Sequence, residues 1–120
     1  MRWSERDVEA YLRRDAGPAP VSEKAFMAAV IRLARQHQWL VYHTWSSKRS
    51  PEGFPDLVLA HPDHRRDTPL IVAELKREDG QCTPAQVAWL SALAGCTGVV
   101  AEVWRPAQLQ DIVERLRARL

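Results

Sequence analysis

The chain has 120 residues, a net charge of +2, 46% hydrophobic residues and 27% charged residues. This length accommodates one domain with one core, and the composition is ordinary for a soluble globular protein. The near-neutral charge does not indicate a nucleic-acid-binding protein by itself, so local patches must carry any such argument.

Two further features argue against other classes of protein. The two cysteines, Cys82 and Cys96, are too far apart for a CxxC pair and have no His/Cys cluster beside them, which argues against a structural zinc site. The charged N-terminus has no apolar signal region, and no stretch approaches the roughly 18 apolar residues of a membrane span. We therefore expect a soluble protein with free thiols in a reducing cytoplasm, and no membrane association.

The first 20 residues are predicted to form a short helix and a linker ahead of the main domain, which spans residues 21–120. Ser4 to Arg14 has an amphipathic pattern, with Ser4 as the expected N-cap. The run Gly17-Pro18-Ala19-Pro20 then interrupts the chain and acts as the linker.

The main domain is predicted to open with a helix and a strand. Ser22 is the expected N-cap of a helix over residues 22–38, because apolar residues recur there at helical spacing. Residues 39–44 are aromatic and β-branched, which predicts a strand. The polar residues 45–55 are predicted to form a loop.

Strands and helices then alternate. Residues 56–60 and 70–77 are predicted strands joined by a charged connection. Thr83 and Pro84 begin a helix to about Ala94, with Gly95 at its C-cap and with Val87, Leu90 and Leu93 on its apolar side. A strand over 99–104 and a helix from Pro106 follow. A helix between two strands indicates one parallel pair, so we predict an α/β fold, a three-layer sandwich with a central mixed β-sheet flanked by helices.

Glu74 and Lys76 are charged residues at the end of an otherwise apolar strand. Because side chains alternate along a strand, Val72, Glu74 and Lys76 share one face. Both faces begin apolar, as expected for a central strand. A carboxylate there is costly to desolvate unless it pairs, binds a metal or opens into a cleft. The alternative is a strand that runs out into solvent after Lys76.

Asp56 and Glu23 are two further candidates. In Gly53-Phe-Pro-Asp56 the glycine permits a sharp turn and the proline fixes its own φ, so the aspartate enters its strand at a defined angle. The alternative is a turn aspartate that caps its own backbone. Glu23 shares the apolar stripe of its helix with Phe26. Its alternative is an N-terminal acid favoured by the helix dipole.

Together these residues indicate a metal site built from oxygen atoms. Asp56 and Glu74 lie on consecutive strands, and a hairpin would bring both carboxylates to one end. Two carboxylates, a backbone carbonyl and waters suit Mg²⁺ or Mn²⁺. Lys76, on the same face as Glu74, could orient an attacking water or stabilise charge on a scissile phosphate.

The sequence Pro55-Asp56 followed by Glu74-Leu75-Lys76 resembles the PD-(D/E)XK signature of restriction and repair nucleases. With Glu23 before it and Thr83-Pro-Ala-Gln86 after it, the ordered set resembles the VRR-NUC branch of that superfamily over about residues 22–105. ExK alone is a weak motif, whereas the ordered set is specific. The resemblance implies a restriction-endonuclease-like fold.

The resemblance also implies a role for each matching residue. The groups that would hold Mg²⁺ or Mn²⁺ are Asp56, Glu74, the Leu75 carbonyl and, directly or through water, Glu23. Lys76 would act on the nucleophilic water, and Gln86 would support the site. The implied reaction is phosphodiester hydrolysis in DNA.

A substrate and an assembly are implied as well. Small stand-alone members of this kind are phage-type proteins that dimerise and cut branched DNA such as Holliday junctions, which predicts a homodimer in a bacterium or a phage-infected cell. Lys48, Arg49 and Arg77 are predicted DNA contacts. Two alternatives stay open: a non-catalytic DNA-binding or assembly module on the same fold, and a restriction-type endonuclease, for which so short a chain leaves little room to recognise a sequence.

Overall fold

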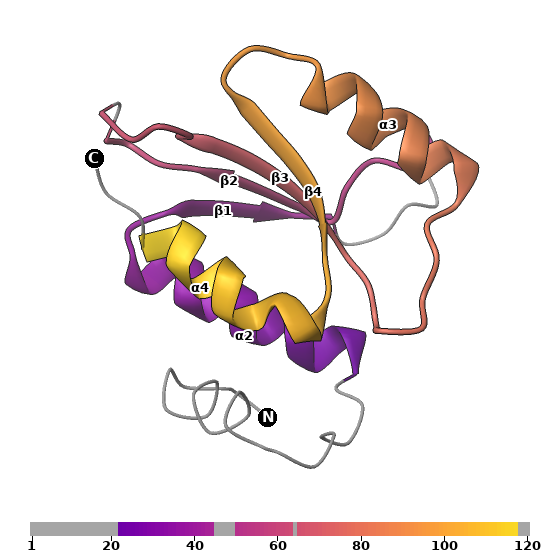
Figure 1. The fold of residues 1–120 in the computed structure, drawn as a ribbon, viewed down its shortest axis with the longest axis horizontal. Helices are drawn as coiled ribbons and strands as arrows, with labels where there is room; N and C mark the ends of the chain where they lie inside the picture. Colours follow the sequence, from indigo (N-terminus) through magenta and orange to yellow (C-terminus); the bar gives the residue numbers. More distant parts are fainter. Residues whose placement is uncertain (1–21, 45–49, 64, 118–120) are drawn as a thin grey trace.

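The computed structural model describes residues 22–44, 50–63 and 65–117, which form a four-stranded sheet with helices on both faces (Figure 1). The predicted helix before Gly17, its linker, and the candidate DNA contacts Lys48 and Arg49 lie outside these residues. The described elements are α2 (Glu23–Gln36), β1 (Leu40–His43), β2 (Leu57–Ala60), β3 (Leu70–Leu75), α3 (Pro84–Ala94), β4 (Val99–Trp104), the 3-10 turn η1 (Pro106–Gln108) and α4 (Leu109–Arg117). The predicted α/β class is confirmed.

The sheet is mixed and has the strand order β1-β2-β3-β4. β2 is antiparallel to both β1 and β3, whereas β3 and β4 run parallel. The chain passes from β3 to β4 through α3, which is the helical crossover that a parallel pair requires. The mixed sheet expected from the order of elements is therefore observed.

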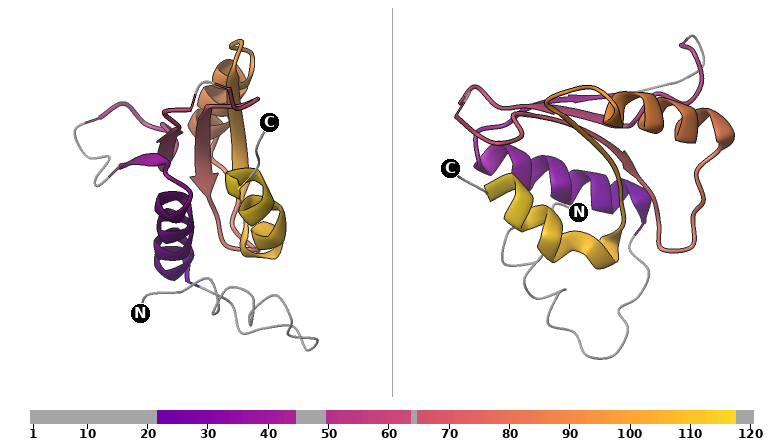
Figure 2. Two further views of the ribbon diagram at one scale, coloured as in Figure 1. Left: turned by 90° about the vertical axis from the view of Figure 1, so that its left-hand side faces the viewer. Right: turned by 45° about the horizontal axis from the view of Figure 1, so that its top comes forward.

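The helices form one layer on each side of the sheet. α2 and α4 contact each other and lie side by side against one face. α3 contacts β3 and β4 from the other side, as both views of the molecule from different angles show (Figures 1 and 2). The arrangement is the predicted three-layer sandwich.

The hydrophobic core fills the space between the sheet and the α2–α4 layer. Leu59, Ile71 and Val100 are directly opposite one another on neighbouring strands, so they share this face. The buried apolar residues of the core are Phe26, Ala29, Val30, Leu33, Ala34, Trp39, Leu57, Leu59, Ile71, Ala73, Leu75, Trp104, Leu109, Ile112 and Leu116. Val72 and Glu74 point to the opposite face, toward α3, because side chains alternate along β3.

α3 differs from its prediction, because none of its residues is buried. Leu90 and Leu93 are half-buried, but Val87, expected on the same apolar side, is 51% exposed. The helix is apolar around most of its circumference, so the periodicity of its sequence did not distinguish the face that meets the sheet.

The element ends agree with the predicted signals in most places. Ser22 and Thr83 cap α2 and α3 as expected, each accepting a hydrogen bond from a backbone N–H in the first turn. α2 ends at Gln36, two residues earlier than predicted, and Gln38 has a φ of +67°, which a helix does not allow. Within the described residues, no helix has the length and apolarity needed to cross a membrane.

Candidate active site

Asp56 and Glu74 come together where β2 begins and β3 ends. Leu57 pairs with Ala73 in the antiparallel ladder. One further pair in the same register would set Asp56 opposite Glu74, and residues opposite each other share a face. The Asp56 Oδ2 atom accepts a hydrogen bond of 2.8 Å from the backbone N–H of Leu75. The sequence prediction that a hairpin unites the two carboxylates agrees with this geometry.

Glu74 is the one charged residue that is buried among the described residues, with 2% of its surface exposed. Its Oε2 atom accepts a hydrogen bond of 3.0 Å from the Gln86 side-chain amide and lies 3.7 Å from Lys76 Nζ. Its Oε1 atom is buried and has no hydrogen-bond partner among the described residues. A buried carboxylate oxygen without a donor is costly and usually marks a place where an ion or a water belongs.

The environment of Glu74 raises the pKa of its carboxyl group from 4.5 to about 7. Burial is the largest cause, because it disfavours the charged form, and the negative charge of Asp56 is the next. Lys76 opposes this rise through its positive charge, while the hydrogen bond that a protonated Glu74 can make to Asp56 and the charge of Glu23 add to it. The site therefore holds more negative charge than its own residues neutralise.

The loop before β2 holds Asp56 in place. Gly53 has a φ of +93°, and a Cβ atom there would lie 2.5 Å from the carbonyl carbon of Ala85. The loop thus packs its backbone directly on the first turn of α3, which a larger residue would prevent. On the other side, the Asp56 carbonyl accepts a hydrogen bond of 2.9 Å from Thr44 N–H. Asp56 is fixed through both its backbone and its side chain.

Lys76 directly follows β3 and keeps the alternation of the strand, so it lies on the same face as Glu74. Its backbone N–H donates to the Trp104 carbonyl at 3.0 Å, and its side chain is 16% exposed. A half-buried ammonium beside a buried carboxylate partly offsets the desolvation of both groups. The chain does run out into solvent directly after Lys76, from Arg77 to Asp79, but Glu74 is buried and Lys76 is largely covered.

Gln86 belongs to both α3 and the site. Its Oε1 atom accepts from Thr83 N–H at 2.8 Å and completes a capping box, while its Nε2 atom donates to Glu74. The spacing from threonine to glutamine therefore fixes the helix start and orients the carboxylate at the same time.

Glu23 lies near this group but outside its hydrogen bonds. It is exposed at the first position of α2, and its charge reaches Glu74 closely enough to raise that group's pKa. Among the described residues, no group of three or more His, Cys, Asp or Glu side chains is placed to hold a metal ion. A contribution of Glu23 through water stays a prediction.

The groups that are present suit a hard divalent cation. Asp56 and Glu74 supply carboxylate oxygens, one of them the buried Oε1 atom without a donor. In the continued register Leu75 would face Pro55, which has no N–H to donate, so the ladder offers the Leu75 carbonyl no hydrogen bond. An oxygen-only set of this kind fits Mg²⁺ or Mn²⁺.

The residues around the end of β3 include one contact that the sequence did not reveal. Arg77, a predicted DNA contact, is exposed and lies 3.7 Å from Asp79. Arg105 Nη1 donates to the carbonyls of Arg77 and Gly80, at 2.6 and 2.7 Å, and so holds the turn after Lys76.

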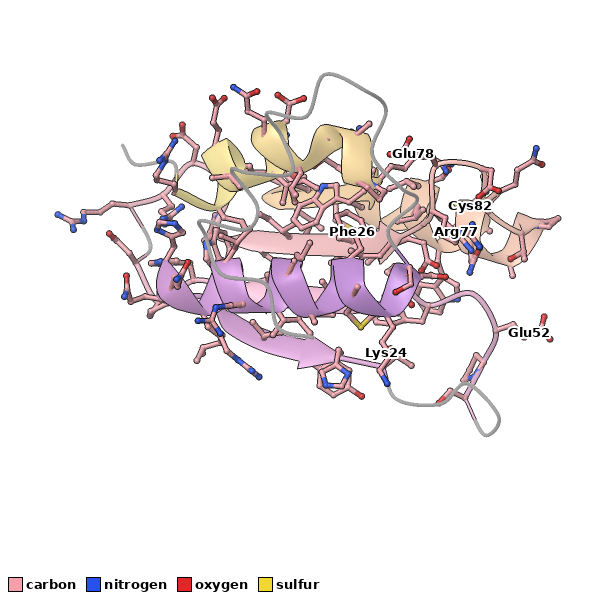
Figure 3. The ribbon with its side chains drawn as sticks, turned by 90° about the horizontal axis from the view of Figure 1, so that it is seen from below. Lys24, Phe26, Glu52, Arg77, Glu78 and Cys82 are labelled. Carbon is pink, nitrogen blue, oxygen red and sulfur yellow. The ribbon has the colours of Figure 1, made fainter. Side chains whose placement is uncertain are left out.

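Figure 3 shows that Lys24, Arg77 and Glu52, from three different segments, all lie toward this end of the molecule.

Comparison with known proteins identifies the fold and the family. The family model described as VRR-NUC domain matches residues 10–108, so the match begins ahead of the predicted boundary at residue 20. A solved structure described as a VRR_NUC domain protein superimposes with a TM-score of 0.55 at 18% identity, over 82% of this chain and 92% of that one, which is a likeness of fold. No curated protein matches the sequence significantly. The family model covers most of the chain, and the protein therefore belongs to the VRR-NUC domain family of nucleases.

Proposed function

We propose that the protein is a metal-dependent DNA endonuclease whose centre is formed by Asp56, Glu74 and Lys76. One observation carries the proposal: Glu74 is buried beside a second carboxylate, with one oxygen lacking any donor among the described residues. A structural carboxylate would have acquired full hydrogen bonding. This one has an oxygen without a donor and a second carboxylate beside it, as a cation-binding group does.

The ion is proposed to be Mg²⁺ or Mn²⁺, held by Asp56, Glu74 and the Leu75 carbonyl, with Glu23 joining through water. When bound, such an ion polarises a phosphate oxygen and lowers the pKa of a water molecule. Gln86 keeps the Glu74 carboxylate oriented by its hydrogen bond to Oε2, which leaves Oε1 for the ion.

Lys76 is proposed to act on the water that attacks the phosphate. Its Nζ atom is 3.7 Å from Glu74 Oε2, longer than a strong hydrogen bond, so it keeps N–H groups for a water or a phosphate oxygen. The lysine can orient that water and stabilise the charge that develops on the phosphate. Arg77 is proposed to contact the DNA backbone, as are Lys48 and Arg49, which lie outside the described residues.

The substrate is proposed to be branched DNA, and the active form a homodimer. The support is the resemblance of the sequence to the small stand-alone members of the family. A two-fold dimer would bring one site to each of two strands.

Cleavage of a labelled four-way junction and of a linear duplex tests this proposal. Each substrate is incubated with Mg²⁺, Mn²⁺ or EDTA, and the parent is compared with Glu74→Ala. Glu114→Ala, which removes an exposed acid from α4, is the matched control. We expect cutting only with metal, a preference for the junction, loss in Glu74→Ala and parental activity in the control. DNA binding without cutting in either metal would instead support the non-catalytic module.

A further inference from the structure

Phe54 and Trp89 form an exposed aromatic pair where the loop before β2 meets α3. Their ring centroids are 5.1 Å apart and their planes meet at 80°, an edge-to-face contact. Phe54 is 36% exposed and Trp89 37% exposed. Because an edge-to-face pair covers little of either ring, aromatic surface stays open to solvent.

The pair is held rigidly. The Trp89 indole N–H donates to the Glu52 carbonyl at 3.1 Å, and Gly53, between Glu52 and Phe54, packs on Ala85. The loop is thus attached to α3 at three successive residues. Rings held in this way lose little conformational freedom when a ligand stacks on them.

The pair also lies next to the acidic centre. Phe54 is two residues before Asp56. Trp89 is three residues after Gln86, hence on the same side of α3, and Gln86 bonds to Glu74. The two segments that carry the aromatic rings are therefore the segments that position the two carboxylates.

The helix that carries Trp89 has no charge of its own. From Gly80 to Ala101 the sequence contains no Asp, Glu, Lys, Arg or His. A phosphate would find no cation on this helix, whereas a flat uncharged ring would find an apolar aromatic surface. The chemistry suits a nucleobase, not the backbone of the DNA.

We propose that Phe54 and Trp89 stack on a nucleobase that has lost a stacking neighbour beside the scissile phosphate. This inference rests on the proposed function and names what the site would recognise: a base with an exposed face, as at an open branch point, since a base inside a continuous duplex is covered by its neighbours on both faces. Stacking does not depend on base identity, so the selection is for DNA structure and not for sequence.

A scan of the substrate tests the inference. 2-Aminopurine is placed in turn at each nucleotide near the branch of a four-way junction, and its fluorescence is followed on binding, with Ca²⁺ in place of Mg²⁺ so that binding is measured apart from cleavage. We expect one position to be quenched by the parent. Replacing that nucleotide by an abasic site should weaken binding by about ten-fold.

Two replacements of Trp89 separate stacking from attachment of the loop. Trp89→Phe and Trp89→Leu both lose the hydrogen bond to Glu52, but only phenylalanine keeps a ring. We expect Trp89→Phe to retain most of the quenching, and the abasic site to have no further effect on Trp89→Leu combined with Phe54→Leu. The control is Leu40→Ala, which changes an exposed apolar residue at the start of β1. This variant should behave as the parent.

Three outcomes are separable. If no position is quenched, or if the abasic effect is the same in every variant, the inference fails. If the variants change the sedimentation of the free protein instead, the pair is an interface with a second copy, and the inference also fails. If quenching is observed but no metal supports cutting, the proposed function fails while the stacking site stands.

Discussion

At the end of the sheet where β3 finishes, Glu74 is buried beside Asp56, its pKa is raised to about 7 and one of its oxygens lacks a donor among the described residues. At the other end, beyond β2, Asp63 accepts two hydrogen bonds from the Arg65 side chain, and this lowers its pKa to about 2. The Asp63 carboxylate is paired with an arginine in contact with water, whereas the Glu74 carboxyl group is desolvated next to a like charge.

The aromatic and basic residues near Asp63 also have partners for their polar groups. His61 uses both ring nitrogens, one toward the His37 carbonyl and one toward Asp63 N–H. Arg66 lies 5.0 Å from the Trp39 ring and donates to the Leu116 carbonyl at the end of α4. These contacts close helix ends and a loop, which is a structural task. The difference teaches that charge alone does not mark a functional site; uncompensated buried charge does.

The largest expected effect on cleavage comes from replacing Asp56, with Asp63 as the comparison. Asp56→Ala should lower cleavage by at least about 1,000-fold, because it removes one of the two proposed metal-binding carboxylates. Asp63→Ala, the same change at the other end, should cut like the parent. Both are measured by single-turnover cleavage of a junction. Equal activity of Asp56→Ala and Asp63→Ala would remove the functional distinction between the two ends.

Lys76→Ala should reduce cleavage by about 100-fold or more, in the range of a lost group that assists proton transfer or charge stabilisation. Mn²⁺ binding, followed by calorimetry, should be retained, since the carboxylates stay in place. A variant that loses cutting and Mn²⁺ binding together would assign Lys76 to the assembly of the metal site.

The opposite pKa shifts predict opposite effects of pH on stability. Unfolded Glu74 loses its proton near its ordinary pKa of 4.5, whereas the folded protein holds it until about pH 7. The folded state binds more protons in this window, so stability falls as pH rises through it, by roughly 3 kcal/mol. Asp63, with its lowered pKa, stabilises the fold above pH 3.8 and loses this effect as pH falls toward 2.

Urea unfolding of the parent and of Glu74→Gln in EDTA, from pH 4.5 to 7.5, measures the first of these effects. The parent should lose stability across this range relative to the variant, which has no carboxyl group to ionise. Parallel curves for the two proteins would show that Glu74 is not electrostatically strained in the fold.

The smallest expected effect is at the structural end. Arg66→Ala should cost about 1 kcal/mol of unfolding free energy, through the lost stacking on Trp39 and the lost hydrogen bond to Leu116, and leave cleavage unchanged. Arg66→Lys, which keeps the charge without the planar group, should recover only part of this stability. A loss of junction cleavage with intact stability would mean that this end also contacts DNA.

The sequence predicted which of the candidate residues come together better than it predicted the packing around them. Alternation along one strand was sufficient to unite Glu74 with Lys76, and consecutive strands brought Asp56 to them, because both relations are local in the chain. The exposure of Val87, the contacts of Arg105 and the Phe54–Trp89 pair were not foreseen. Each depends on how α3 or a turn packs against a distant segment, and an evenly apolar helix carries no periodic signal for its orientation.

Gln86 makes the geometry of the site depend on the stability of one helix end. One amide group both starts α3 and orients Glu74, and α3 contributes no buried residue to hold it on the sheet. Fraying of that helix end would disengage the carboxylate while the core between the sheet and the α2–α4 layer stays folded. The temperature at which the enzyme stops working would then lie below the temperature at which it melts, and the loss would reverse on cooling.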